Sequence, residues 1–165
     1  MSGKVGRDGE ALVVGIGNPD RGDDGVGPAV ANRLRGRAPP GICILERRGN
    51  VLDLMEDWEG FAAVIVVDAA APAGRPGRVD RLDLVDCPLA VGVACSSTHG
   101  FGVGEAVELA RRLGRLPRHL IAYLVEGERF DVGAPLSPFV ARAVDPVLDR
   151  IAAELTRISA AARDA

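Results

Sequence analysis

AAVIVVDAA, residues 62–70, is the stretch of this 165-residue chain that decides its fold. The apolar run from Phe61 to Val67 is the most continuous in the sequence and is rich in β-branched residues, which predicts a buried central strand. A strand that is apolar on both faces is typical of a parallel sheet covered by helices on each side. Asp68 follows this run, where an unpaired buried carboxylate would cost several kcal/mol. We therefore expect Asp68 to face a crevice, a cation or a hydrogen-bond donor.

The segments on either side of this strand alternate between strand and helix patterns. Strands are predicted at residues 11–17, 42–45, 61–67, 78–86 and 119–125, and helices at 25–37, 51–58, 103–113 and from Ser137 onward. Charged residues alternate with apolar ones at 78–86, which is typical of a half-exposed strand near a sheet edge. The pattern predicts a three-layer α/β/α fold with a mostly parallel, twisted sheet of about five strands. We expect one domain over residues 1–165, with flexible ends at 1–9 and 160–165.

The charge distribution and the short apolar runs argue against several kinds of partner. The 20 basic residues are scattered along a chain of net charge −3, so the basic stripe of a nucleic-acid-binding protein is absent. No run reaches the roughly 18 apolar residues of a membrane span, and the polar N-terminus lacks a secretory signal pattern. Three cysteines without a C-x-x-C pair disfavour both a disulfide framework and a thiolate metal site. We expect a cytoplasmic protein that binds neither nucleic acid nor a membrane.

A glycine-rich loop, GIGNPDRGDDGVG at residues 15–27, follows the first predicted strand. Its first two glycines stand as in a dinucleotide-binding fingerprint, but Asp20 takes the third glycine position, and Asp23 and Asp24 follow where a helix begins. Carboxylates there would repel the phosphate that such a loop normally holds at a helix N-terminus. One acidic residue can cap the helix, but a single cap does not need three of them. We expect at least one to be a ligand or a catalytic group, and Asp24 is our choice on the resemblance described below.

Asp24, Asp68 and His99 each follow a separate apolar run, His99 within SSTHGFG at residues 96–102. If these runs are neighbouring strands of one parallel sheet, their carboxyl ends share an edge and the three side chains can converge on one ion. Two carboxylates and an imidazole suit Zn, Ni, Co or Mn. A role for Asp68 in capping the next loop stays open. A Ser–His–Asp triad is disfavoured because the chain has no G-x-S-x-G elbow and the serines lie too close to His99 in the same loop.

Four segments are distinctive in combination: GIGNPDRGDDGVGPAVANRL at 15–34, VIVVDAA at 64–70, STHGFGVGEAVELA at 97–110 and VEGERFDVGAPLSPFVARAV at 125–144. Together they resemble the hydrogenase maturation proteases, the endopeptidases that trim the C-terminus of nickel-iron hydrogenase large subunits. The resemblance implies that Asp24, Asp68 and His99 bind the nickel already installed in the large-subunit precursor. The substrate then brings the metal with it. Another divalent cation, such as Zn or Cd, could occupy the same site in a crystal.

One loop departs from the family's pattern. Family members carry an Asp followed by glycines and Thr after the second strand, whereas this chain has Glu46-Arg47-Arg48-Gly49-Asn50. In the family this loop is associated with substrate recognition. The resemblance therefore implies that Glu46, Arg47 and Arg48, together with Asn18, contact the substrate. The altered loop raises the question of which hydrogenase is the client.

The resemblance implies a metal-dependent endopeptidase that is activated by its own substrate. Water held by the metal or by a carboxylate would attack a carbonyl group that the site positions and polarises. A chaperone that checks the precursor's nickel without cutting it would use the same three ligands, so that function stays open. Peptidyl-tRNA hydrolases also begin with GIGNP, but this chain lacks their histidine-containing stretch and their basic surface.

Overall fold

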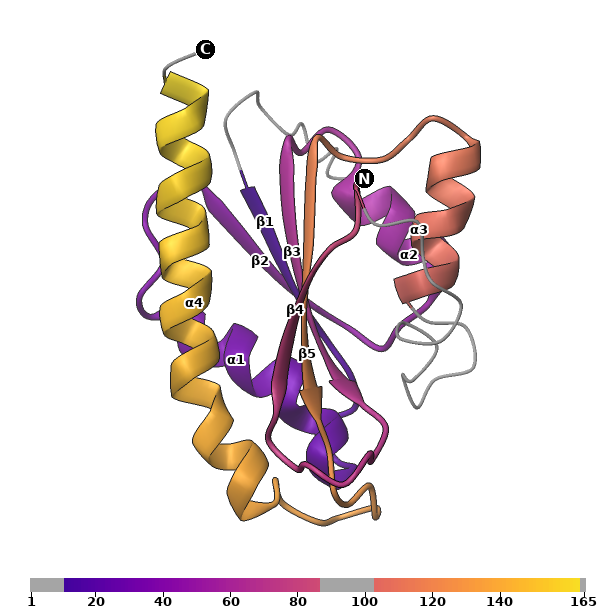
Figure 1. Ribbon diagram of the computed structural model, residues 1–165, viewed down its shortest axis with the longest axis vertical. Helices are drawn as coiled ribbons and strands as arrows, with labels where there is room; N and C mark the ends of the chain where they lie inside the picture. The colour runs from indigo at the N-terminus through magenta and orange to yellow at the C-terminus, as the bar shows by residue number, and fades with distance from the viewer. Residues whose placement is uncertain (1–10, 87–102, 164–165) are drawn as a thin grey trace.

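Among residues 11–86 and 103–163, which the computed structural model describes, five strands form one sheet in the order β2–β1–β3–β5–β4 (Figure 1). The strands are β1 Ala11–Ile16, β2 Ile42–Arg47, β3 Ala63–Ala70, β4 Val79–Asp83 and β5 His119–Glu126. All neighbouring strands run parallel except β4, which is antiparallel to β5 at the edge of the sheet. The carboxyl ends of the four parallel strands therefore meet at one edge.

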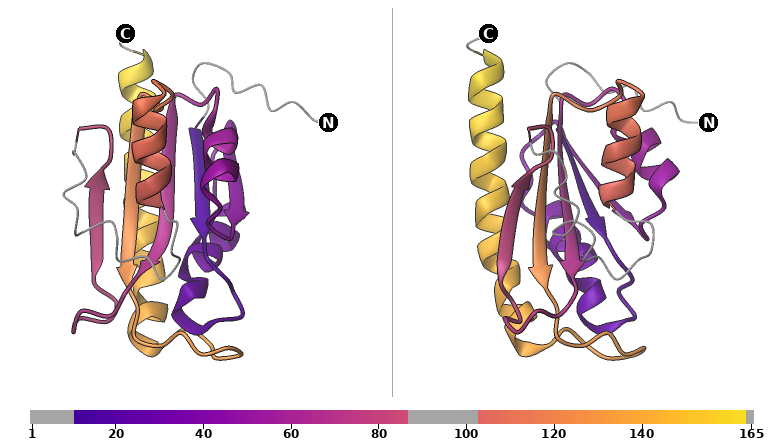
Figure 2. Two further views of the ribbon diagram at one scale, coloured as in Figure 1. Left: turned by 90° about the vertical axis from the view of Figure 1, so that its right-hand side faces the viewer. Right: turned by 45° about the vertical axis from the view of Figure 1, so that its right-hand side comes forward.

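Helices cover both faces of the sheet (Figure 2). The helices α1 Val26–Arg35 and α4 Pro138–Arg163 pack on one face, and α2 Val51–Trp58 and α3 Val103–Arg112 pack on the other. A short 3-10 helix, η1 Gly22–Gly25, connects the end of β1 to α1. The prediction of a three-layer α/β/α fold with a mostly parallel sheet is confirmed. Within the described ranges, none of the helices combines the length and the apolar composition that a membrane span requires.

The central strand β3 supplies both halves of the core. Val64 and Val66 pack with α2 and α3, whereas Ile65 and Val67 pack with α1 and α4, because successive strand residues point to opposite faces. By the same alternation, Asp68 faces the side of the sheet that α2 and α3 cover. We expected the strand to end before Asp68, but its pairing with β5 continues through Ala70. Asp68 therefore lies inside the strand, where the hydrogen-bonded ladder fixes its backbone.

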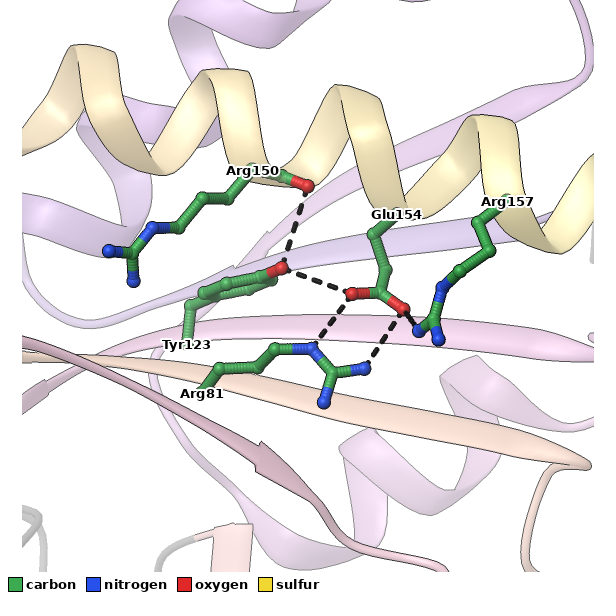
Figure 3. Close-up of polar contacts among 5 residues, drawn as sticks. All are labelled: Arg81, Tyr123, Arg150, Glu154 and Arg157. Atoms are coloured by element: carbon green, nitrogen blue, oxygen red, sulfur yellow. Dashed lines mark hydrogen bonds and ion pairs between the residues drawn. The ribbon is translucent and has the colours of Figure 1, made fainter.

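The edge strand β4 is fastened to α4 by charged groups around Glu154 (Figure 3). The guanidinium of Arg81 donates through Nε and Nη2 to the two carboxylate oxygens of Glu154, at 2.8 and 3.0 Å. Arg157 pairs with the same carboxylate, and the Tyr123 hydroxyl donates to it at 3.2 Å. The hydrogen bonds from Arg81, joined by Arg157, lower the pKa of Glu154 to about 2. This cluster, which we call the Glu154 clasp, ties a charged edge strand to a helix.

Several elements differ in extent from their predicted bounds, and β4 is shorter than the predicted 78–86. The strand β2 extends to Arg47 because its pairing with β1 continues to Ile16. The helix α4 reaches Arg163, so residues 160–163, which we expected to be flexible, are helical. The helix α1 begins later than predicted because η1 takes the preceding residues. These shifts leave the predicted order of elements unchanged.

Candidate active site

The glycine-rich loop brings η1 into close contact with the carboxyl ends of β1 and β3. A Cβ atom built at Gly17, whose φ is +136°, would lie 1.9 Å from the main-chain oxygen of Asp24. A Cβ atom at Gly27 would lie 2.2 Å from the oxygen of Ile16 and 2.6 Å from that of Val67. Glycine is required at both positions because the backbones touch there. The glycines of this loop therefore serve close packing, and the packing carries Asp24 to the sheet edge.

Asp24 and Asp68 are both buried at this edge, with 2% and 1% of their surfaces exposed. Asp24 accepts a hydrogen bond through Oδ2 from the amide of Asn18 at 2.8 Å, and Asp68 accepts one through Oδ1 from the amide of Ala69 at 2.8 Å. Burial is the main cause that raises the pKa of Asp68 to about 8; the Ala69 hydrogen bond opposes this rise, and the nearby charge of Asp24 adds to it. The structure thus brings these two predicted residues into mutual electrostatic contact. A buried carboxylate pair of this kind is characteristic of functional sites.

Asp68 also lines a small, mostly apolar cavity. The other lining residues come from β4, β5, the turn after β4 and the first turn of α3: Leu82, Leu84, Val103, Gly104, Ala122 and Leu124. The third predicted residue, His99, lies outside the described residues. Within residues 11–86 and 103–163, no three His, Cys, Asp or Glu side chains are grouped closely enough to hold a metal ion. The described part of the site therefore consists of two carboxylates beside the start of α3.

Asp23, the neighbour of Asp24, has a different environment. It is fully buried, and its carboxylate accepts hydrogen bonds from the amides of Glu128, Arg129 and Ser137 and from the Ser137 hydroxyl. Burial raises its pKa, but the hydrogen bonds outweigh burial and hold the pKa below the usual value. The sequence shows two adjacent aspartates and does not separate their roles. The structure separates them, since the donors to Asp23 all come from the β5–α4 loop.

Glu46 lines an open cleft beside η1 and α1. Its other lining residues include Pro19, Gly25, Pro28 and Asn32. The cleft thus reaches Gly25, the residue that follows Asp24. The Glu46 carboxylate also pairs with the guanidinium of Arg35 on α1.

The remaining three predicted substrate-binding residues have different surroundings. Arg47 points to the opposite face of the sheet from Glu46 and forms a two-pronged ion pair with Asp57 of α2, with Nη2 to Oδ1 at 2.8 Å. Arg48 is exposed. Asn18 is partly buried, and its side-chain oxygen accepts a hydrogen bond from the amide of Asp20 at 3.0 Å. The structure places the Asn18 amide on Asp24, Glu46 on a cleft that reaches Gly25, and Arg47 against α2.

A model of the hydrogenase maturation protease family matches residues 28–154. The chain belongs to this family. Among curated relatives of this maturation protease, the hydrogenase expression/formation protein HupD of Bradyrhizobium diazoefficiens is 31% identical over 148 residues, 87% of this chain and 76% of that protein. The hydrogenase 2 maturation protease of Escherichia coli is 26% identical over 147 residues, 87% and 89% of the two chains.

Solved structures show the same fold for this maturation protease. The hydrogenase maturating endopeptidase HybD from Escherichia coli has a TM-score of 0.71 at 22% identity, covering 90% of this chain and 93% of that chain. The solution structure of an endopeptidase from Escherichia coli has a TM-score of 0.75 at 23% identity, with the same coverage. Family membership and fold together identify an endopeptidase of hydrogenase maturation.

Proposed function

We propose that this maturation protease removes the C-terminal extension of a nickel-loaded nickel-iron hydrogenase large-subunit precursor and recognises its nickel through Asp24, Asp68 and His99. The observation that carries the proposal is the buried pair of Asp24 and Asp68 at the carboxyl edge of the sheet. A cation bound by two buried carboxyl groups favours their ionised forms and offsets the repulsion that ionisation would otherwise bring. Nickel arriving with the substrate supplies that cation.

His99 is assigned to the same site by the resemblance and by chain connectivity. It precedes Val103 by four residues, and Val103 lines the cavity beside Asp68. Four residues of chain span at most about 14 Å, a length that allows His99 to reach the carboxylates. A neutral imidazole added to two carboxylates completes a ligand set that suits nickel.

The proposed chemistry is hydrolysis of a peptide bond that the bound nickel positions. The oxygen of a water molecule attacks the carbonyl carbon, the C–N bond breaks, and the departing amine takes a proton that the water has lost. The three side chains contribute positioning, and the nickel contributes Lewis acidity. Because the metal belongs to the substrate, a precursor without nickel leaves the site incomplete. Cleavage of the precursor then occurs only after nickel has been inserted.

Intact-mass spectrometry of the precursor tests this function. Wild-type protein should shorten a nickel-loaded precursor by its C-terminal peptide and leave a nickel-free precursor at full mass. Asp24→Asn, Asp68→Asn and His99→Ala should abolish cleavage. Asp20→Asn is the matched control, because Asp20 is an exposed aspartate of the same loop. This variant should cleave the precursor at the wild-type rate. Undiminished cleavage by Asp68→Asn or His99→Ala would remove that residue from the mechanism, and a stable complex without any mass change would favour the chaperone.

We also propose that the cleft beside Asp24 receives the client chain, with Glu46 contacting it. Glu46→Gln should raise KM for the precursor and leave kcat nearly unchanged, since neither Asp24 nor Asp68 lines the cleft that Glu46 lines. Arg48→Ala tests the exposed part of the same loop by the same measurement. Arg47→Ala needs a parallel stability measurement, because it also breaks the ion pair with Asp57.

A further inference from the structure

The carboxylate of Asp23 accepts four hydrogen bonds from one distant segment, the β5–α4 loop at residues 127–137. Its Oδ1 accepts from the Ser137 amide at 2.6 Å, and its Oδ2 accepts from the amides of Glu128 and Arg129 at 2.7 and 3.0 Å. The Ser137 hydroxyl donates to Oδ2 at 2.9 Å. A carboxylate offers about four lone-pair sites, and three of these donors share Oδ2 while one is on Oδ1. All four donors are protein groups of the β5–α4 loop, so Asp23 is bonded chiefly to that loop.

Main-chain contacts interlock the same two segments. The amides of η1 donate to the loop: that of Asp23 to the main-chain oxygen of Arg129 at 2.8 Å, and that of Gly22 to the main-chain oxygen of Ala134 at 3.1 Å. In the other direction, the amide of Gly133 donates to the main-chain oxygen of Asp20 at 2.7 Å. A Cβ atom at Gly22 would lie 2.4 Å from the Arg129 oxygen, so the two backbones are in direct contact. The side chain of Asp23 lies at the centre of this contact. Main-chain hydrogen bonds and the Asp23 side chain together join the loop to η1.

We propose that Asp23 is a positioning residue that locks the 127–137 loop onto η1 and thereby holds Asp24 in place for the substrate's nickel. Asp23 and Asp24 are consecutive residues of η1, so a shift of one moves the other. This inference rests on the proposed function for the role of Asp24. Its geometric part, the dependence of Asp24's position on Asp23, stands separately.

The amide of Asn18 reports the position of Asp24, because it donates to Asp24 Oδ2 at 2.8 Å. Hydrogen bonding to a carboxylate shifts an amide proton resonance downfield, and loss of the bond reverses the shift. A role in general stability alone would leave this resonance in place as long as the protein is folded. The resonance therefore distinguishes positioning from stability.

The test compares Asp23→Asn with Glu154→Gln, each studied at a temperature where circular dichroism shows it folded. Both changes neutralise a buried carboxylate that accepts several hydrogen bonds, but the Glu154 clasp joins α4 to the edge strand and does not touch η1. The Asn18 amide resonance and the single-turnover cleavage of nickel-loaded precursor are measured for both. Ser137→Ala, which removes one donor to Asp23, provides a milder version of the same perturbation.

Asp23→Asn should move the Asn18 amide resonance and slow cleavage by about 10- to 100-fold, the loss expected when a reacting group is misplaced by about 1 Å. The Kd for the precursor should change by a much smaller factor than the cleavage rate. Ser137→Ala should shift both readouts in the same direction by less, and Glu154→Gln should change neither. If Asp23→Asn does not fold, Ser137→Ala carries the comparison.

A wild-type cleavage rate in Asp23→Asn, or an Asn18 resonance that does not move, would overturn the positioning role. Should wild-type protein fail to cut the nickel-loaded precursor, the proposed function fails by itself. In that case the Asn18 resonance alone decides whether Asp23 positions Asp24.

Discussion

Gly27 lies where the first turn of α1 meets the backbones of β1 and β3, and Gly27→Ala should destabilise the protein strongly. The added Cβ would lie 2.2 Å from the oxygen of Ile16, 2.5 Å from its nitrogen and 2.6 Å from the oxygen of Val67. All three atoms belong to the backbones of hydrogen-bonded strands, so no flexible side chain can move aside. The helix must instead shift away from the sheet, and η1 with it.

The size of the effect follows from two opposing contributions. Overpacking of a tight interior costs about 1–3 kcal/mol, and contacts made only with backbone favour the upper end, about 3 kcal/mol. Alanine is favoured over glycine in a helix by about 1 kcal/mol. The net loss is about 2 kcal/mol, which lowers Tm by about 4–8 °C for a domain of this size.

Gly36→Ala, at the C-terminal end of the same helix, is the matched control. Gly36 has a φ of −80°, and a Cβ atom there would come no closer than 4.0 Å to the oxygen of Arg33. Alanine at such a position should stabilise by about 0.4–1 kcal/mol by restricting the unfolded chain. Thermal and urea unfolding, followed by circular dichroism, measure both variants. A Tm for Gly27→Ala at or above that of Gly36→Ala would refute the close-packing argument.

Three further predictions concern buried or capping polar groups. The folded-state pKa of Glu154 is lowered from 4.5 to about 2, so its ionised form contributes stability that is present above pH 4.5 and lost as pH falls through 2. Glu154→Gln should therefore remove about 2 kcal/mol of the change in unfolding free energy between about pH 5 and pH 2. Urea unfolding at a series of pH values measures this change. Asp68→Asn should raise stability by about 1–3 kcal/mol while abolishing cleavage, because the amide is free of the carboxylate's desolvation cost and of repulsion from Asp24. Asn50→Ala should cost about 1 kcal/mol, since its side-chain oxygen caps α2 by accepting from an amide of the first turn at 3.0 Å.

Each of these predictions has a definite contrary result. If the unfolding free energy of Glu154→Gln falls between about pH 5 and pH 2 as much as that of the wild type, the Glu154 clasp adds no stability. A lower Tm for Asp68→Asn would show that the carboxylate is stabilised by its surroundings before any metal arrives. An unaltered free energy of unfolding in Asn50→Ala would mean that the cap is replaced by solvent.

The sheet could be predicted because its signals are local. The run from Phe61 to Val67 marks a strand that is buried on both faces, and the charged positions at 78–86 mark an edge. What was misplaced is where strands stop. Asp68 lies within β3 because the β5 ladder continues past it, and no feature of residues 62–70 reveals the length of a partner strand.

Part of the geometry of the candidate site could be predicted, for the same physical reason. Asp24 and Asp68 come together because parallel strands share a carboxyl edge, which the order of elements already implies. The division of roles between Asp23 and Asp24 depends on donors from residues 128–137, more than 100 positions away in the chain. Adjacent strand residues point to opposite faces, so the different surroundings of Glu46 and Arg47 follow once both are known to lie in β2. The sequence pattern ended that strand at residue 45 and so did not show it.

The bond between Asp23 and Ser137 spans 114 positions of the chain. A ribosome that adds about 5–20 residues per second therefore makes Ser137 some 6–23 s after Asp23. Throughout that interval the nascent polypeptide contains Asp23 and Asp24 but not the β5–α4 loop whose amides bind Asp23. If Asp23 positions Asp24 as proposed, the site cannot be ordered before residues 128–137 have been synthesised.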